Sequence, residues 1–532
     1  MKRIIMQNTL KTIILPVNTS REALFHKPFR EKLEPLLPAY LRQCRWFGGK
    51  ARTMTAVRIT GSCPLTGRSG TTYLCTLTVS YRDGGAERYL LPVSCRPGEE
   101  VPLVRSEDNV PVLARVTVGR KKSILFDGAY DRGFREDCFR YIAEADAPRQ
   151  EPVLLKGTPG RVTREWIREG RRLPEPRLLG KEQSNTSFVY GDAFILKLYR
   201  RPAAGIHPEV EMARFLTEET GFTHTAPFAG FLELSSPGSP PATIGLLQAY
   251  VHHQDDAWNY SLRQVSRFLQ AGSPEEEKRA GESYAAAAGL LGRRTAELHQ
   301  ALISAPANSD FAARAFTPAD REELHASIRL LSDRMLEGLR VEGDDLPPEA
   351  AAAGRKILRD RSGIFRLLGE KDLTGPAGMK TRVHGDYHLG QLLCTGDDFV
   401  IIDFEGEPAR PIEERRRKRS PLVDVAGMIR SFHYAAYGAI FLRPGHDPEK
   451  TAFLTLRAEL WYRTMSDIFL TSYLKTMAGG ASVLPGKKAG LKRLLDLCML
   501  EKVIYELNYE LNNRPDWAII PLRGLRSLLS TR

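Results

Sequence analysis

The sequence predicts an α+β protein in which β-rich material precedes a mostly helical region. Three observations carry this prediction: short alternating apolar segments up to about residue 251, long segments of helical periodicity after about residue 258, and one β island inside the helical part. A chain of 532 residues with 42% hydrophobic residues can form several domains around sizeable cores. We expect three parts, at residues 1–118, 119–251 and 252–532.

The first two parts are predicted to be β-rich because each contains a hairpin signal. Residues 60–118 contain two apolar runs that flank Asp83-Gly84-Gly85. In the second part Gly191-Asp192 separates two further alternating runs. Short turns of Gly and Asp between such runs are typical of β-hairpins.

The third part is predicted to be helical because its apolar residues recur at helical spacing. Several of these segments begin with acidic residues, which favour the positive end of a helix dipole. The predicted helices are 274–303, 317–340, 347–369, 447–478 and 487–513.

The chain carries 77 Lys+Arg against 64 Asp+Glu, a formal net charge of +13. Such a surplus can serve a nucleic acid, an anionic small molecule or a solvated helix face. Its densest run is Arg415–Arg419. Nothing in the sequence resembles a nucleic-acid recognition module, so we expect no nucleic-acid partner and favour a nucleotide as the anion near this run.

The seven cysteines are dispersed and none forms a C-x-x-C pair, which argues against a disulfide framework or a zinc knuckle. The N-terminal stretch lacks the continuous apolar region of a secretory signal. The longest apolar segment, Ala435–Leu442, is far shorter than the roughly 20 residues of a membrane helix. We therefore expect a cytosolic protein without a membrane anchor; the oligomeric state is open.

The β island at 383–410 holds the most informative side chains. It is predicted to form a loop with Asp386, a strand from Gln391, a tight turn, and a second strand that ends before Asp403. Phosphoryl transfer needs a carboxylate to accept the acceptor's proton and hard oxygen ligands for Mg²⁺ at the nucleotide phosphates. Asp386 is the candidate base, and Gln391 and Asp403 are the candidate metal ligands.

An upstream lysine completes this chemistry. Lys197 lies in the apolar run FILKLY, where a buried ammonium is costly unless it meets an anion such as a phosphate. A helix carboxylate should hold it, and we prefer Glu211 while Glu209 stays open.

Two further segments are candidates for nucleotide binding. No glycine-rich phosphate loop is present, and a polar segment expected to join the first two strands offers hydroxyls and N–H groups in its place: Ser184, Asn185, Thr186 and Ser187. An ordinary turn is an equal alternative. The backbone at Gln248 and Tyr250 could bond adenine, since this strand leads into the helical part.

These residues lie in stretches that resemble the maltokinases, bacterial enzymes of α-glucan metabolism related to aminoglycoside and choline kinases. Some family members are fused to trehalose synthase. The matching stretches are 44–52 (CRWFGGKAR), 182–201, 382–393 (RVHGDYHLGQLL), 403–436 and 505–525.

The resemblance implies a bilobal fold like that of eukaryotic protein kinases, with a β-rich cap, a small lobe and a helical lobe. It implies transfer of the γ-phosphoryl group of ATP to the anomeric hydroxyl of maltose, with Mg²⁺ as cofactor. Asp386 would be the general base, Gln391 and Asp403 the Mg²⁺ ligands, and Lys197 the nucleotide lysine. Association with a trehalose synthase is a further implication.

The resemblance also places the acceptor pocket in the helical lobe. Sugar recognition pairs aromatic rings with groups that bond hydroxyls, and one segment offers both: Tyr505, Glu510, Arg514 and Trp517. Core packing of these aromatics is an equal alternative.

Three remaining features have open roles. His384 is a candidate substrate contact, although His384 and His388 are more typical of residues that hold a catalytic loop through hydrogen bonds. Glu405 could tune the metal, bind a phosphate or pair with an arginine. The segment Arg45–Arg52 has no expected role beyond a contact between cap and lobe.

Two rival functions stay open at this point. Another sugar or amino sugar, such as glucosamine, could be the acceptor of the same machinery. A catalytically silent, kinase-like binding protein is the other alternative, against which stand Lys197, Asp386, Gln391 and Asp403.

Overall fold

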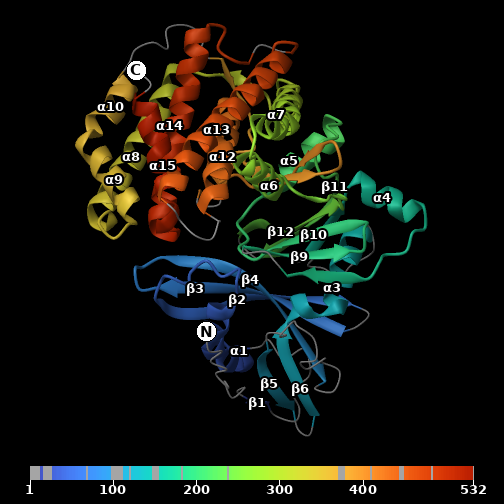
Figure 1. Cartoon of the computed structure of the whole chain (residues 1–532). Helices are drawn as coiled ribbons and strands as arrows, with labels where there is room; N and C mark the ends of the chain where they lie inside the picture. The colour runs from blue at the N-terminus through green and yellow to red at the C-terminus, as the bar shows by residue number, and fades with distance from the viewer. Residues whose placement is uncertain are drawn as a thin grey trace. The chain divides into compact units, whose positions relative to one another are not determined.

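Figure 1 shows the chain as a computed structural model. It describes residues 12–15, 27–67, 70–97, 112–118, 121–145, 155–180, 184–236, 239–369, 378–407, 410–441, 448–480 and 483–530. The chain forms two compact units. The first comprises Met1–Arg214 and Ala226–Tyr250, and the second comprises Phe215–Thr225 and Val251–Arg532.

The first unit begins with a six-stranded sheet of order β1-β5-β6-β4-β3-β2. Its strands are β1 (Thr12–Leu15), β2 (Met54–Gly67), β3 (Gly70–Tyr81), β4 (Ala86–Pro97), β5 (Val112–Val118) and β6 (Lys121–Asp127). The predicted hairpin is confirmed, since β3 and β4 pair across the turn that contains Gly84, whose φ of 84° suits glycine. The boundary expected after residue 118 falls between β5 and β6, which pair in this one sheet, so the sheet extends to Asp127.

A second six-stranded sheet of the first unit has the order β7-β11-β12-β10-β9-β8. Its strands are β7 (Leu155–Pro159), β8 (Pro176–Leu179), β9 (Asn185–Tyr190), β10 (Phe194–Tyr199), β11 (Phe228–Ser236) and β12 (Ser239–Ala249). The hairpin predicted at Gly191 is confirmed by the pairing of β9 with β10. Leu74 and Leu90 of the first sheet share one core with Phe188 and Leu196 of the second.

One buried arginine ties the two sheets together. Arg200 is 1% exposed; its guanidinium donates to Thr186 Oγ1 at 2.7 Å and to Asp127 Oδ2 at 2.9 Å. Tyr40 donates its hydroxyl to the same Asp127 oxygen at 2.8 Å, and the ring of Trp46 lies 4.7 Å from the guanidinium carbon. The RWFGGKAR segment, through Trp46, thus has the predicted contact between cap and lobe.

The second unit is mostly helical. Its helices of nine residues or more are α6 (Ala257–Gln270), α7 (Pro274–Ile303), α8 (Pro318–Glu342), α9 (Pro348–Arg359), α10 (Arg361–Gly369), α12 (Leu422–Phe441), α13 (Pro448–Met477), α14 (Lys488–Asn513) and α15 (Ile519–Ser530). Local sequence explains their starts. Ser273 caps α7, and Thr317 forms a capping box with Asp320 at α8. The single helix expected at 347–369 is instead two helices, because the chain leaves helical geometry at Asp360.

Helix α12 lies in the interior of the second unit, where it packs against α6, α13, α14 and α15. Beside it stands the predicted β island, a hairpin of β16 (Leu392–Cys394) and β17 (Phe399–Ile401). In the described part of the chain no helix has the length and apolarity to cross a bilayer. All seven cysteines are free, in line with the prediction of no disulfide framework.

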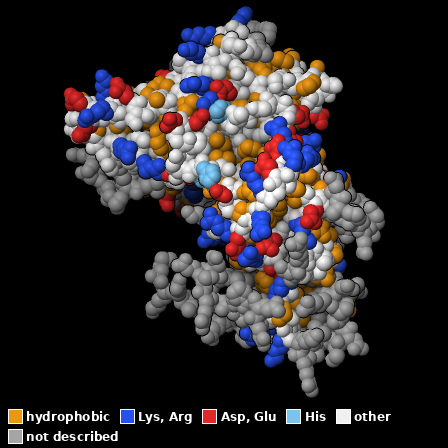
Figure 2. Space-filling model, turned by 90° about the vertical axis from the view of Figure 1, so that its right-hand side faces the viewer, with side chains coloured by type: hydrophobic (Ala, Val, Ile, Leu, Met, Phe, Trp, Pro, Cys, Tyr) orange, Lys and Arg blue, Asp and Glu red, His pale blue; other side chains and the backbone are white. Residues whose placement is uncertain are grey.

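The basic run is not a helix face. Helix α11 (Ile412–Arg415) ends within it, and the following residues turn away. Arg417 pairs with Glu323 and Arg419 pairs with Glu501. Among the coloured side chains on the face drawn in Figure 2, Lys and Arg are interspersed with Asp and Glu.

Candidate active site

The loop that carries Asp386 is held by a buried carboxylate of α12. The backbone N–H groups of His384 and Gly385 donate to the two oxygens of Asp424 at 2.8 and 2.9 Å. His299 Nε2 lies 3.1 Å from the same carboxylate. Burial alone would raise the pKa of Asp424, but the hydrogen bond and charge of His299, the charge of His384 and the N–H of Gly385 lower it below its ordinary value. The loop is therefore held in place by hydrogen bonds to a negatively charged carboxylate.

A close approach fixes the same loop from the other side. A side chain at Gly427 of α12 would come within 2.5 Å of the carbonyl oxygen of Tyr387, so only glycine fits. Gly385 has a φ of 84°, which lets the chain turn just before Asp386.

The loop histidines hold backbone. His384 is 1% exposed, its Nε2 lies 2.9 Å from the carbonyl of Ile402, and its Nδ1 accepts from the N–H of Asp386 at 3.4 Å. His388 Nδ1 accepts from the N–H of Gly390 at 3.0 Å. Because both ring nitrogens of His384 are engaged, the structure corrects its candidacy as a substrate contact and leaves the structural role.

Asp386 meets a lysine from α14. Lys502 Nζ lies 3.2 Å from Asp386 Oδ1 and 3.7 Å from Glu407 Oε1. Burial alone would raise the pKa of Asp386, but the charge of Lys502 and the neighbouring His388 and His384 hold it below the ordinary value. Asp386 is thus a carboxylate at neutral pH and can accept a proton. A cavity lined by Glu407, Lys502 and other residues of the second unit opens at this place.

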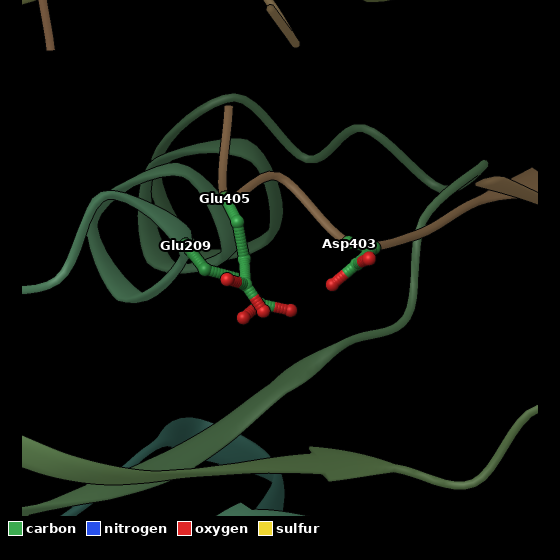
Figure 3. A group of neighbouring side chains, drawn as sticks. All are labelled: Glu209, Asp403 and Glu405. Carbon is green, nitrogen blue, oxygen red and sulfur yellow. The ribbon is translucent and has the colours of Figure 1, made fainter. Parts of the chain in front are cut away.

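The hairpin brings the two candidate metal ligands to one end. Ile402 donates its N–H to the carbonyl of Gln391 at 3.0 Å. Gln391 precedes β16 and Asp403 follows β17, so both lie at the same end of the antiparallel hairpin. Asp403 has a φ of 69°, the one positive φ among the described non-glycine residues, and such strain gathers at functional sites. Figure 3 shows Asp403 and Glu405 on the loop after β17. A carboxylate oxygen of Asp403 lies within 4.8 Å of a carboxylate oxygen of Glu405.

These donors suit Mg²⁺. A neutral amide oxygen and a carboxylate are hard ligands of the kind that Mg²⁺ prefers. Gln391 and Asp403 would hold the ion, which neutralises charge on the nucleotide phosphates when bound. Glu405 lies 3.9 Å from Arg415, so it has the arginine partner expected as an alternative role.

The candidate nucleotide lysine, Lys197, lies in the first unit. Lys197 Nζ lies 3.2 Å from Glu209 Oε2, and Tyr199 donates its hydroxyl to the same oxygen at 2.7 Å. Glu209 begins α5 (Pro208–Arg214) and is 2% exposed. Glu209, the alternative left open, makes this ion pair as a buried acid of the first turn, and the preference for Glu211 stays a prediction.

The polar segment upstream is a strand and not a loop. Asn185, Thr186 and Ser187 begin β9, where Ser187 pairs with Lys197 in register. The Thr186 hydroxyl accepts from Arg200 on the face turned toward the first sheet, and its role as a phosphate contact stays a prediction. Ser184 immediately precedes the strand and stays a candidate.

The predicted adenine contacts are constrained by the sheet. Gln248 lies in β12 between two paired strands, and its side-chain amide donates to the carbonyl of Ala226 at 3.3 Å. The N–H of Tyr250 already donates to the carbonyl of Ala193 at 2.9 Å. That N–H is therefore already used within the protein and does not face a purine as predicted. The carbonyl of Tyr250 is still a candidate.

The four predicted acceptor residues separate into two groups. Tyr505 lines the cavity at Lys502. Glu510, 1% exposed, instead accepts two hydrogen bonds from Arg514 at 2.9 and 2.7 Å, and the ring of Trp517 lies beside that guanidinium. Glu510, Arg514 and Trp517 thus pack together at the C-terminal end of α14, where the charges of Glu510 and Arg514 form an ion pair.

Sequence reasoning missed Lys502 and Asp424. Lys502 is three residues before Tyr505 on α14, a spacing that places both on one helix face. That spacing is a usable signal. For Asp424 the signal was weaker: an acid in the first turn of a strongly apolar helix.

Comparisons with known proteins cover most of the chain. Residues 40–131 match the family described as "Maltokinase N-terminal cap domain", and residues 175–406 match "Phosphotransferase enzyme family". The chain thus carries a maltokinase-type N-terminal cap followed by a region of the phosphotransferase enzyme family. This result confirms the fold class predicted from the sequence, and it shows a phosphotransferase that uses ATP and an alcohol acceptor.

The relatives of this kinase include two glucosamine kinases. The one from Streptacidiphilus jiangxiensis is 27% identical over 354 residues, 66% of this chain and 73% of that protein. The one from Mycolicibacterium smegmatis (strain ATCC 700084 / mc(2)155) is 26% identical over 393 residues, 73% of this chain and 88% of that protein. A solved glucosamine kinase in complex with glucosamine, ADP and inorganic phosphate superposes with a TM-score of 0.60 at 19% identity, over 92% of this chain and 97% of that one. At this identity the likeness concerns the fold.

Proposed function

We propose that this kinase phosphorylates the anomeric hydroxyl of maltose, with ATP as donor, to give maltose 1-phosphate and ADP. The observation that carries the proposal is the ionised Asp386 at the edge of a cavity in the helical unit. The match of residues 40–131 to the maltokinase cap supports maltose as the acceptor.

Each residue then has a defined task. The acceptor hydroxyl gives its proton to Asp386 while its oxygen bonds to the γ-phosphorus. The bond from that phosphorus to the β,γ-bridging oxygen breaks, and ADP leaves. Lys197, held by Glu209, binds nucleotide phosphates, and Gln391 with Asp403 holds Mg²⁺.

Polar residues extend from the cavity at Lys502 into an adjoining cavity. The cavity at Lys502 shares Arg410, Arg419 and Glu501 with an adjoining cavity of about 100 Å³. Alternating cations and carboxylates along this lining can bond sugar hydroxyls. The second ring of a disaccharide would lie along it. A cytosolic location and association with a trehalose synthase stay predictions.

Glucosamine is the second candidate acceptor, favoured by the names of the relatives. The test is ADP release by purified protein with ATP, Mg²⁺ and maltose, glucose, glucosamine or trehalose, followed by identification of the phosphorylated hydroxyl. We expect maltose to support the highest kcat/KM. Turnover with glucosamine alone would exclude the maltose proposal.

A further inference from the structure

The side chain that contacts the candidate base is itself a cation. Lys502 reaches Asp386 from α14, more than a hundred residues away in the sequence, and its ammonium also lies 5.2 Å from the centre of the Tyr505 ring. The carboxylates of Asp386 and Glu407 raise the pKa of Lys502 against the effect of burial, so the lysine is charged at neutral pH. The cavity therefore contains an ammonium group beside the candidate base.

We propose that Lys502 is a specificity-determining residue that rejects amino sugars and selects acceptors with an uncharged group beside the reacting hydroxyl. This inference rests on the proposed function, in which the anomeric hydroxyl is the acceptor. It concerns which sugars bind at Asp386, whereas the proposed function concerns the reaction itself.

The two acids that line the cavity, and Asp386 beside it, each pair with a cation. Glu407 pairs with Arg410, and Glu501 pairs with Arg419. Asp386 pairs with Lys502. An ammonium ion that enters this cavity would find no surplus carboxylate, and its lost hydration would not be compensated.

Lys502 also lies close to the place where the acceptor hydroxyl would bind. A hydroxyl that gives its proton to Asp386 must lie within hydrogen-bond reach of the carboxylate, whose oxygen is 3.2 Å from Lys502 Nζ. The substituent on C2 of the sugar is next to the anomeric hydroxyl, so an ammonium there would come within a few ångströms of Lys502. Two like charges at such a separation in a partly buried site repel strongly enough to lower binding by roughly tenfold or more. A C2 hydroxyl, by contrast, can accept a hydrogen bond from Lys502.

The experiment compares Lys502→Gln with a matched variant, Lys492→Gln. Lys492 lies on the same helix but is exposed, with its side chain 65% accessible and paired with Asp496. For each protein, kcat/KM is measured with maltose, glucose, N-acetylglucosamine and glucosamine. Binding of glucose and glucosamine is measured separately by calorimetric titration, so that a variant with slow chemistry still reports its preference. Thermal unfolding checks that both variants are folded.

The intact chain and Lys492→Gln should prefer glucose to glucosamine by roughly tenfold or more, and Lys502→Gln should lose at least most of that preference, in turnover or in binding. An unchanged glucose-to-glucosamine ratio in folded Lys502→Gln would overturn the role of Lys502 while leaving the maltose reaction standing. Absence of turnover with every neutral sugar in the intact chain would overturn the proposed function, and the inference with it. N-acetylglucosamine separates charge from size: if it is rejected as strongly as glucosamine and Lys502→Gln relieves neither, the discrimination is steric and the inference is wrong.

Discussion

Two aspartate–cation pairs, one in each unit, differ in what surrounds them. Arg200 and Asp127 are each 1% exposed and lie between two sheets, where Tyr40 and Thr186 supply further hydrogen bonds. The side chains of Lys502 and Asp386 are 15% and 22% exposed beside a cavity.

From this difference we expect the same kind of ion pair to stabilise the fold in one place and to serve the reaction in the other. A sealed pair has no room for a substrate, so its charges can only stabilise one arrangement of the protein around them. A pair at a cavity keeps one carboxylate accessible to an incoming hydroxyl.

The largest effect is expected at the accessible pair. Asp386→Asn should lower kcat by about 10²–10⁴-fold, because the amide cannot accept the acceptor's proton. Thermal stabilisation by ATP with Mg²⁺ should persist. Asp397→Asn, an exposed aspartate in the β16–β17 turn, is the control and should keep its turnover. Full activity of Asp386→Asn would remove Asp386 from the base role.

The sealed pair should affect stability more than chemistry. Asp127→Asn leaves the guanidinium of Arg200 buried without its counter-charge, so the free energy of unfolding should fall by about 3–5 kcal/mol. Denaturant titration measures this change. The double variant Asp127→Leu with Arg200→Met removes both charges and should recover part of the loss. Equal instability of the double variant would mean that packing and not charge is responsible.

Asp424 shares a feature with each pair: it is buried like Asp127, and it contacts the loop that carries Asp386. Its pKa is lowered in the folded protein, so its stabilising effect is present above the unfolded value near 3.9 and is lost as the pH falls through the lower folded value. Relative to Asp424→Asn, the intact chain should be more stable by about 1–3 kcal/mol at neutral pH, and the gap should close below about pH 4. A gap that does not change with pH would contradict a charged Asp424.

What the sequence predicted and what it missed follow from the range of the contacts. The β16–β17 hairpin, its turn and the placement of Gln391 and Asp403 are local, so alternation and turn chemistry were sufficient. Lys502 and Asp424 reach the Asp386 loop from other helices, and a local pattern indicates at most the helix face on which each lies, not the residue that it contacts. The sequence could not decide between Glu209 and Glu211 for a third reason. Both lie in one helical turn, and only packing decides which of them is buried.

That choice allows a matched comparison of a smaller effect. Glu209→Gln should raise KM for ATP about tenfold, because Lys197 loses the charge that holds it, whereas Glu211→Gln should change KM less. Steady-state kinetics at saturating acceptor measures both. The reverse ranking would restore Glu211 as the main partner of Lys197.

The smallest effect is expected where an ion pair is neither sealed nor near the base. Arg417 and Glu323 are a surface pair, with side chains 61% and 62% exposed. Water competes for both groups and salt screens them, so Arg417→Gln should change the free energy of unfolding by less than about 1 kcal/mol, and by less still in high salt. Chemical denaturation at low and high ionic strength measures the difference. A loss as large as that of Asp127→Asn would show that exposure does not separate the two kinds of pair, and the distinction drawn from Arg200 and Lys502 would fail with it.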